Sequence, residues 1–226
     1  MWGVVGVIIA VGLGWKLHRN FLQADARKQN ATAALFANAL ELIDDPSLEQ
    51  QGPHEFPRLT GTFRGFQVQI KPVVDTLPIR RLPALWLLVT LQDKLALTAR
   101  FDMMMRPAGP TTFSNFDLLP QTLKHPAGFP EHAVIRTDDA AAVLPAEIIQ
   151  PHIAAFFGAH AKELLITERG LRIVWLLAEA DRVRYGIFRQ AEFGAVEIDA
   201  MVLRGILDNL LDIRQAVIAW TRQNND

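Results

Sequence analysis

The chain has 226 residues, of which 50% are hydrophobic and 21% are charged, and its formal net charge is −1. This length suits one domain, or one domain with an appendage. The hydrophobic content excludes a disordered chain, which needs low hydrophobicity and a high net charge. The absence of cysteine excludes disulfide scaffolds, thiolate metal sites and cysteine nucleophiles. The near-zero net charge provides no overall attraction to nucleic acid or to a membrane.

The N-terminal segment is strongly apolar. Residues 2–15 carry no charged side chain, and Lys16 and Arg19 follow them. As a helix this run is shorter than the hydrocarbon core of a bilayer, but basic side chains that snorkel to the headgroups extend its apolar length. The sequence therefore predicts a membrane anchor at residues 1–22. The basic residues after the anchor place the rest of the chain in the cytoplasm.

Small residues form a stripe within this anchor. Gly6, Ala10 and Gly14 are spaced four residues apart, which lets two helices approach closely. One interpretation is association of the anchor with itself or with another membrane protein. The other is that a run rich in small residues produces this spacing by chance.

A helix and a linker are expected to connect the anchor to the domain. Residues 23–45 place apolar side chains at helical spacing and end in an acidic pair before a proline, which predicts a juxtamembrane helix. Residues 47–57 are polar and contain glycine and proline, as is typical of a linker. We therefore expect residues 23–57 to connect the anchor to a single domain at residues 58–226.

The first half of this domain shows the periods of β-strands. Residues 66–70 alternate apolar and polar side chains, which predicts a strand with one wet face. Residues 84–91 are almost continuously apolar, as in a central strand buried on both faces. A turn at residues 92–94 and renewed alternation over 95–103 predict a hairpin. Residues 106–130 hold five prolines and two glycines and are expected to cross one end of the sheet irregularly.

A second meander is expected after a broken helix. The helix begins at Pro145, runs through Phe157 and is kinked or split at Pro151. Residues 164–167 and 171–177 are expected to pair around a turn that contains Gly170, and a third strand is expected at 183–189.

The last element is a long helix at residues 196–220, with one apolar face. Together these elements predict an α+β fold: an N-terminal transmembrane helix followed by a mainly antiparallel sheet domain with packed helices. The long C-terminal amphipathic helix is one of the packed helices.

Catalytic and cofactor motifs are missing from the sequence. Neither of the two serines lies in a G-x-S-x-G motif, no phosphate-binding loop is present, and the six histidines lack metal-ligand spacing. We therefore expect no catalytic residue, no cofactor and no metal. Asp75 precedes two arginines and is interpreted either as half of an ion pair that holds a loop or as part of an anion site. An unrecognised hydrolase or transferase would have to use loop residues such as Asp75, His125 or His132.

Basic residues gather early in the domain. Residues 56–106 contain eight basic and three acidic side chains. Arg64, Lys71, Arg80 and Arg81 are therefore candidates for contact with anionic lipid or an acidic partner. The alternative is a solvated strand face. Nucleic acid is not expected, because the basic residues are not interleaved with exposed aromatic ones.

Two stretches carry a resemblance to a known group. The segments GTFRGFQVQIKPVVDTLPIRRLPALWLLVTL (61–91) and ELLITERGLRIVWL (163–176), with the apolar N-terminus, resemble uncharacterised single-pass membrane-anchored proteins of bacteria. The resemblance implies a bacterial inner-membrane location and supplies no catalytic residues.

Three functions are consistent with the sequence. The leading hypothesis is a non-catalytic binding, scaffold or accessory protein of a bacterial inner-membrane assembly. The alternatives are a domain that binds anionic lipid or a small amphiphile, and an unrecognised hydrolase or transferase.

Overall fold

The computed structural model describes residues 34–50, 55–77, 82–188 and 191–225. The strands in these residues are β1 (Asp44–Glu49), β2 (Arg58–Phe63), β3 (Phe66–Asp75), β4 (Ala84–Gln92), β5 (Phe101–Met105), β6 (Gln121–Thr122), β7 (Ala133–Thr137), β8 (Ala161–Thr167) and β9 (Gly170–Glu179). They form a nine-stranded sheet in the order β1-β2-β3-β4-β9-β8-β5-β7-β6. Each neighbouring pair is antiparallel.

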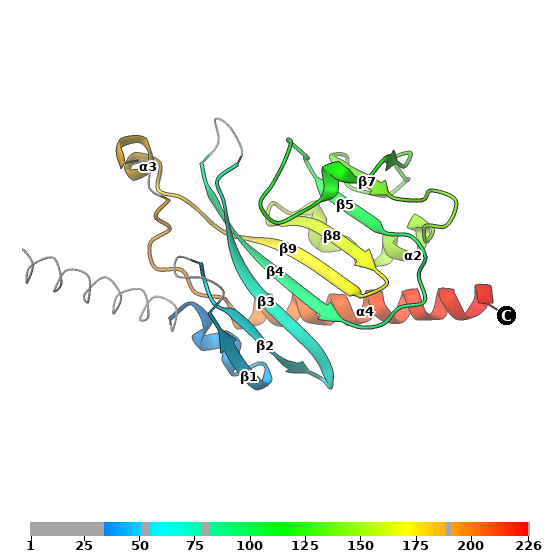
Figure 1. Ribbon diagram of the computed structural model, residues 1–226, viewed down its shortest axis with the longest axis horizontal. Coiled ribbons are helices and arrows are strands. Elements are labelled where there is room, and N and C mark those ends of the chain that lie inside the picture. The colour runs from blue at the N-terminus through cyan, green and yellow to red at the C-terminus, as the bar shows by residue number, and fades with distance from the viewer. Residues whose placement is uncertain (1–33, 51–54, 78–81, 189–190, 226) are drawn as a thin grey trace, which may run out of the picture.

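The helical elements are mostly short. Residues 34–40 are helical, and the named helices are η1 (Phe116–Leu118), α2 (Ala146–Ile149), η2 (Gln150–His152), η3 (Ala154–Phe157), α3 (Arg182–Phe188) and α4 (Ala200–Asn225). In Figure 1 the long helix α4 runs along the sheet, and α3 lies near the end of the sheet where β9 finishes.

The predicted fold class needs one correction. Within the described ranges, no helix combines the length and the apolar character needed to cross a membrane. The longest of them, α4, carries charged side chains along its exposed face. The fold that the structure describes is therefore an antiparallel sheet with a long C-terminal helix, and the transmembrane helix included in the prediction is not part of it. The segment expected to form that helix, residues 1–22, lies outside the described residues.

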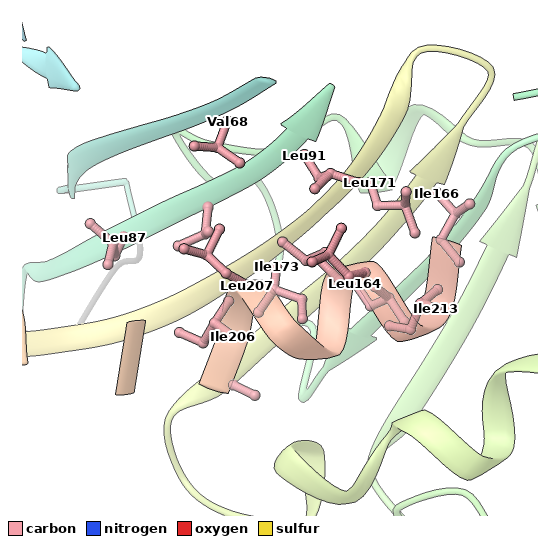
Figure 2. Close-up of a cluster of buried hydrophobic side chains, with 14 of the residues drawn as sticks. Val68, Leu87, Leu91, Leu164, Ile166, Leu171, Ile173, Ile206, Leu207 and Ile213 are labelled. Carbon is pink, nitrogen blue, oxygen red and sulfur yellow. The ribbon is translucent and has the colours of Figure 1, made fainter. Parts of the chain in front are cut away.

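One face of the sheet forms the main core against α4. Strand side chains point alternately to the two faces, so every second residue of β4, β8 and β9 reaches this side. In Figure 2, Leu207 and Ile213 of α4 lie against Leu164 and Ile173 of the sheet, within one buried cluster. The buried positions of α4 recur every three or four residues, as the 3.6-residue helical period requires. They are Leu203, Ile206, Leu207, Leu210, Leu211, Ile213, Val217 and Thr221.

The opposite face carries a much smaller apolar cluster. The segment after β5, residues 106–120, which we call the strap, lies over this face. Phe113 and Phe116 of the strap pack on Leu88, Met104 and Val174 of the strands. The excursion expected at residues 106–130 is irregular over 106–120, where η1 is the one helical turn, but the short strand β6 follows at 121–122. The irregular part lies over a face of the sheet and does not cross its end as predicted.

Several sequence predictions are confirmed. Residues 66–70 lie in β3, and residues 84–91 lie in β4, a central strand. Strands β8 and β9 form the expected hairpin, in which Gly170 has a φ of 135°. A Cβ atom at this position would lie 2.1 Å from the carbonyl oxygen of Leu91, so only glycine fits. The helix begun near Pro145 is split at Pro151 into α2, η2 and η3.

The predicted hairpin of residues 84–91 with 95–103 is wrong. Strand β4 pairs with β3 and β9, whereas β5 pairs with β7 and β8. The backbone amides of Asp93 and Leu95 donate to carbonyls of the β8–β9 turn. The chain therefore leaves β4 across that turn instead of folding back on β4.

Two further elements differ from the prediction. The end of the helix expected at 23–45 and the start of the linker expected at 47–57 together form the edge strand β1, and in the described part of that helix only residues 34–40 are helical. The backbone of β1 pairs with β2, although its side chains are exposed. The strand expected at 183–189 is instead the helix α3, in which Tyr185 N donates to Asp181 O in a helical turn. Exposed edge strands and short helices bury too few side chains to show a clear hydrophobic period.

Candidate functional site

The strap divides the second face of the sheet. The strap begins at the end of β5 and crosses the face of β8, β9 and β4. Its residue Thr112 reaches β3, on the far side of these three strands. There Thr112 N donates to Asp75 Oδ1 at 3.2 Å, and Thr112 Oγ1 donates to Val74 O at 3.2 Å. The strap then returns towards β7, where the Arg136 guanidinium lies 5.2 Å from the ring centroid of Phe116. A hollow lies on each side of this path.

Beneath the returning half of the strap lies a buried polar cluster of Asp102, Glu163, Arg172 and Ser114. Asp102 on β5 is 3% exposed and Glu163 on β8 is 0% exposed. Arg172 Nη2 on β9 donates to Glu163 Oε2 at 3.2 Å. Ser114 Oγ, on the strap, donates to Glu163 Oε1 and accepts a hydrogen bond from Phe116 N at 3.1 Å. The cluster therefore ties the strap to three strands.

Both carboxyl groups of this cluster have raised pKa values. Burial, reinforced by the negative charge of Glu163, raises the pKa of Asp102 from 3.8 to about 9. Burial also raises the pKa of Glu163, although Arg172 and Ser114 favour its charged form. One guanidinium cannot balance two buried carboxylates. Asp102 therefore holds its proton at neutral pH.

The smaller hollow, of about 260 Å³, opens beside this cluster. Asp102 Oδ1 and Arg172 Nε have no hydrogen-bond partner among the described residues. Ser114 also borders the hollow, but its oxygen already donates to Glu163 and accepts from a backbone amide. These contacts make Ser114 a polar anchor for the strap.

The larger hollow, which we call the end cleft, has a volume of about 910 Å³. It lies where β3, β5 and β9 end and where β4 and β8 begin. Trp86 and Leu176 form part of its lining and are cross-strand partners. The first half of the strap lines one wall, and α3 lines another. The lining residues are Asp75, Thr76, Leu77, Leu82, Ala84, Trp86, Met105, Arg106, Ala108, Gly109, Thr111, Ala159, Ala161, Lys162, Leu176, Glu179, Arg182, Tyr185 and Gly186.

Some charged groups of the end cleft are already engaged in hydrogen bonds. Lys162 Nζ donates to the carbonyl oxygens of Met105 at 2.5 Å and Arg106 at 3.0 Å. Asp75 is 2% exposed, and its Oδ1 accepts the amides of Leu77 and Thr112. The interpretation of Asp75 as a residue that orders a loop fits these contacts, although its partners here are backbone amides.

Other polar groups of the end cleft lack partners. Arg106 and Arg182 are exposed and have no carboxylate partner within the described ranges. The indole Nε1 of Trp86 is buried without an acceptor among the described residues. The end cleft thus combines apolar surface with two unpaired guanidinium groups and an unpaired donor.

The structure does not gather the basic residues that the sequence singled out. Arg64, in the β2–β3 turn, pairs with Asp208 of α4 at 3.0 Å, and Lys71 pairs with Glu55 at 3.5 Å. Neither lines either hollow. Arg80 and Arg81 lie outside the described residues, as do Gly6, Ala10 and Gly14. Their proposed roles in lipid or helix contact stay predictions.

The candidate loop histidines are also not gathered. His125 Nδ1 lies 3.3 Å from Ala133 O, and neither His125 nor His132 lines the end cleft or the smaller hollow. Of the three loop residues suggested for a hydrolase or transferase, only Asp75 borders a hollow. Within the described ranges, no cluster of three or more histidine and carboxylate side chains is arranged to hold a metal ion.

Sequence reasoning missed the buried polar cluster. Asp102, Glu163 and Arg172 each lie within a mostly apolar strand, and all of their neighbours in sequence except Lys162 are buried in the main core. A charged side chain inside such a strand is a signal, because it is costly to bury unless it is paired. What the sequence does not show is that the three strands are adjacent, since β5 lies far from β8 and β9 along the chain.

Comparison with known proteins gives little further information. No protein-family model matches the chain, and no curated protein matches its sequence. Among solved structures, the chain is similar to the crystal structure of the mycobacterial trehalose monomycolate transport factor A, TtfA. The TM-score is 0.41 and the sequence identity is 9%, over 79% of this chain and 77% of that chain. This likeness is too low to bear on function.

Proposed function

We propose that the protein is a non-catalytic binding protein that holds its ligand in the end cleft. The observation that carries this proposal is the open cleft itself, about 910 Å³ in volume. Ligand sites in proteins are concave, span roughly 300–1,000 Å³, and combine apolar walls with a few placed polar groups. The end cleft has these properties, with Trp86 and Leu176 as apolar surface and arginines in its walls.

Binding is favoured over catalysis by the positions of the reactive side chains. An active site needs a nucleophile or acid–base pair within reach of one bound substrate. Ser114 is engaged within the buried polar cluster, and His125 and His132 do not line the end cleft. A scaffold or accessory role in an assembly is one use of such a binding site. The predicted partners and the inner-membrane location stay predictions.

Blocking the end cleft tests this proposal. Ala159 is exposed and lines the end cleft, so Ala159→Trp places a large ring in the ligand's volume. Ala141 is also exposed but lies outside both hollows, so Ala141→Trp is the matched control. Native mass spectrometry of the full chain, gently purified from its own cells, would detect a retained small molecule or partner.

We expect the wild-type chain and Ala141→Trp to retain the bound species, and Ala159→Trp to lose it. Thermal unfolding of all three proteins would show whether the fold is intact. Retention by Ala159→Trp, or no bound species on any of the three proteins, would contradict the proposal.

A further inference from the structure

We propose that the ligand of the end cleft is a single-chain amphiphile with an acidic head group, such as an alkyl carboxylate or alkyl phosphate. This inference rests on the proposed function and adds the chemical class of the ligand. The head group contacts Arg106 and Arg182, and the alkyl chain lies over Trp86 and Leu176.

The charges of the lining favour an anionic head group. Three cationic side chains and two carboxylates line the end cleft. Of the carboxylates, Asp75 is buried and bound to backbone amides, whereas Glu179 is exposed. Arg106 and Arg182 are exposed and unpaired within the described ranges. Guanidinium groups bind carboxylate and phosphate oxygens through charge-assisted hydrogen bonds, so these two arginines suit an acidic group.

The apolar part of the lining favours an alkyl chain. Leu77 is 52% exposed, and it borders the end cleft together with Leu82. Trp86 and Leu176, on adjacent strands, extend this apolar surface along the sheet. Exposed apolar surface next to unpaired cations matches a molecule that has an apolar tail and an anionic head.

The shape of the site favours a free amphiphile over a membrane surface. A bilayer offers its head groups as a flat layer, whereas the end cleft is a hollow bounded by the strap, α3 and the ends of five strands. A molecule that enters it brings both its head and its chain. Binding to the surface of anionic vesicles alone is therefore an outcome that would overturn the inference.

Two probes with the same alkyl chain test the inference on the full chain. Dodecyl phosphate carries an acidic head and dodecanol a neutral one, and both are used below the concentrations at which they aggregate. The cleft variant is Arg106→Ala with Arg182→Ala. The control is Arg64→Ala with Lys71→Ala, which removes two cations outside the end cleft. Isothermal titration calorimetry gives the affinity for each probe.

We expect dodecyl phosphate to bind the wild-type chain more tightly than dodecanol does. The cleft variant should bind dodecyl phosphate about tenfold more weakly, because it loses charge-assisted hydrogen bonds. Its affinity for dodecanol should not change, and the control should match the wild type with both probes. Glu179→Gln removes the exposed carboxylate of the lining and should tighten binding of dodecyl phosphate.

The outcomes that contradict the inference distinguish the acidic class of the ligand from the binding function of the end cleft. Equal affinity for both probes, or an unchanged affinity of the cleft variant for dodecyl phosphate, would overturn the acidic class and leave a binding cleft. If the control variant lost as much affinity for dodecyl phosphate as the cleft variant, the phosphate would be binding to surface charge outside the end cleft, and the inference would be overturned. Binding to phosphatidylglycerol vesicles without binding of monomeric dodecyl phosphate would replace the inference with a membrane contact. Loss of the native bound species in Ala159→Trp tests the binding function separately.

Discussion

The two faces of the sheet are built by different means. On the α4 face, a regular helix places an apolar side chain against the strands at nearly every turn, and the core is continuous. On the strap face, an irregular segment covers the strands with two phenylalanines and a buried polar cluster, and hollows remain on both sides. Stability is therefore expected to depend mainly on the α4 face, and binding on the strap face.

The difference follows from backbone geometry. A helix satisfies its own backbone hydrogen bonds, so it can present an uninterrupted apolar face to a sheet. An irregular segment must find partners for its backbone groups, and the amides of Thr112 and Phe116 find them in the side chains of Asp75 and Ser114. Polar anchors of this kind must lie on the sheet face itself, which is why charged residues occur inside otherwise apolar strands.

The largest expected effect is on the α4 face. Leu207 is 0% exposed within the main core. Replacing a buried leucine by alanine removes apolar contacts and leaves a cavity, so Leu207→Ala should lower the free energy of unfolding by about 3 kcal/mol. Guanidinium chloride denaturation measures this value. The control is Met201→Ala at a position that is 78% exposed, and equal losses in the two variants would contradict the role assigned to α4.

The strap face should respond to pH. The pKa of Asp102 is raised from 3.8 to about 9, so the folded state binds one more proton than the unfolded state between these values. The free energy of unfolding should therefore fall as pH rises through this window, by about 1 kcal/mol per pH unit at most, and level off above it. In Asp102→Asn this contribution should disappear. Denaturation at about pH 5, 6.5 and 8 measures the slopes expected from this linkage.

The control for this pH effect is Asp117→Asn, which removes a partly exposed carboxyl of the strap. Its slope should follow that of the wild-type protein. Parallel pH profiles for Asp102→Asn and the wild-type protein would show that folding does not raise the pKa of Asp102.

A smaller effect is expected at the point where the strap is tied to the sheet. Ser114→Ala removes a hydrogen bond to the buried carboxylate of Glu163 and should lower the free energy of unfolding by about 1.5 kcal/mol. Hydrogen exchange should also become faster in residues 113–117. Ser47→Ala, at the exposed serine of β1, is the matched control. Unchanged exchange in Ser114→Ala would mean that Phe113 and Phe116 hold the strap alone.

The smallest effect is expected for Arg64→Ala. The pair of Arg64 with Asp208 joins the β2–β3 turn to α4, but the two side chains are 57% and 36% exposed. Asp208 Oδ1 makes no hydrogen bond among the described residues, so the contact lacks hydrogen-bond geometry. Exposed pairs contribute little, and the loss should be about 0.5 kcal/mol or less. A loss as large as that of Leu207→Ala in the same denaturation measurement would contradict this ranking.

Particular elements show where sequence reasoning works. The helical period of residues 196–220 predicted α4, and alternation predicted β3, because these elements bury a full face against the core. Gly170 marked its turn because the close approach of Leu91 O excludes a side chain. Residues 95–99 misled the prediction, since their alternation reflects packing beside the β8–β9 turn and not strand pairing.

The sequence by itself determined the α4 face, the central apolar strand and the β8–β9 hairpin. Each of these depends on a period or a turn residue that is local in the chain. Only the tertiary structure decided that β5 lies beside β8, that Asp102 and Glu163 therefore share one buried cluster, and that the strap leaves a cleft lined by Arg106 and Arg182. These features depend on the order of strands in the sheet. That order results from long-range packing, which local patterns in the sequence do not encode.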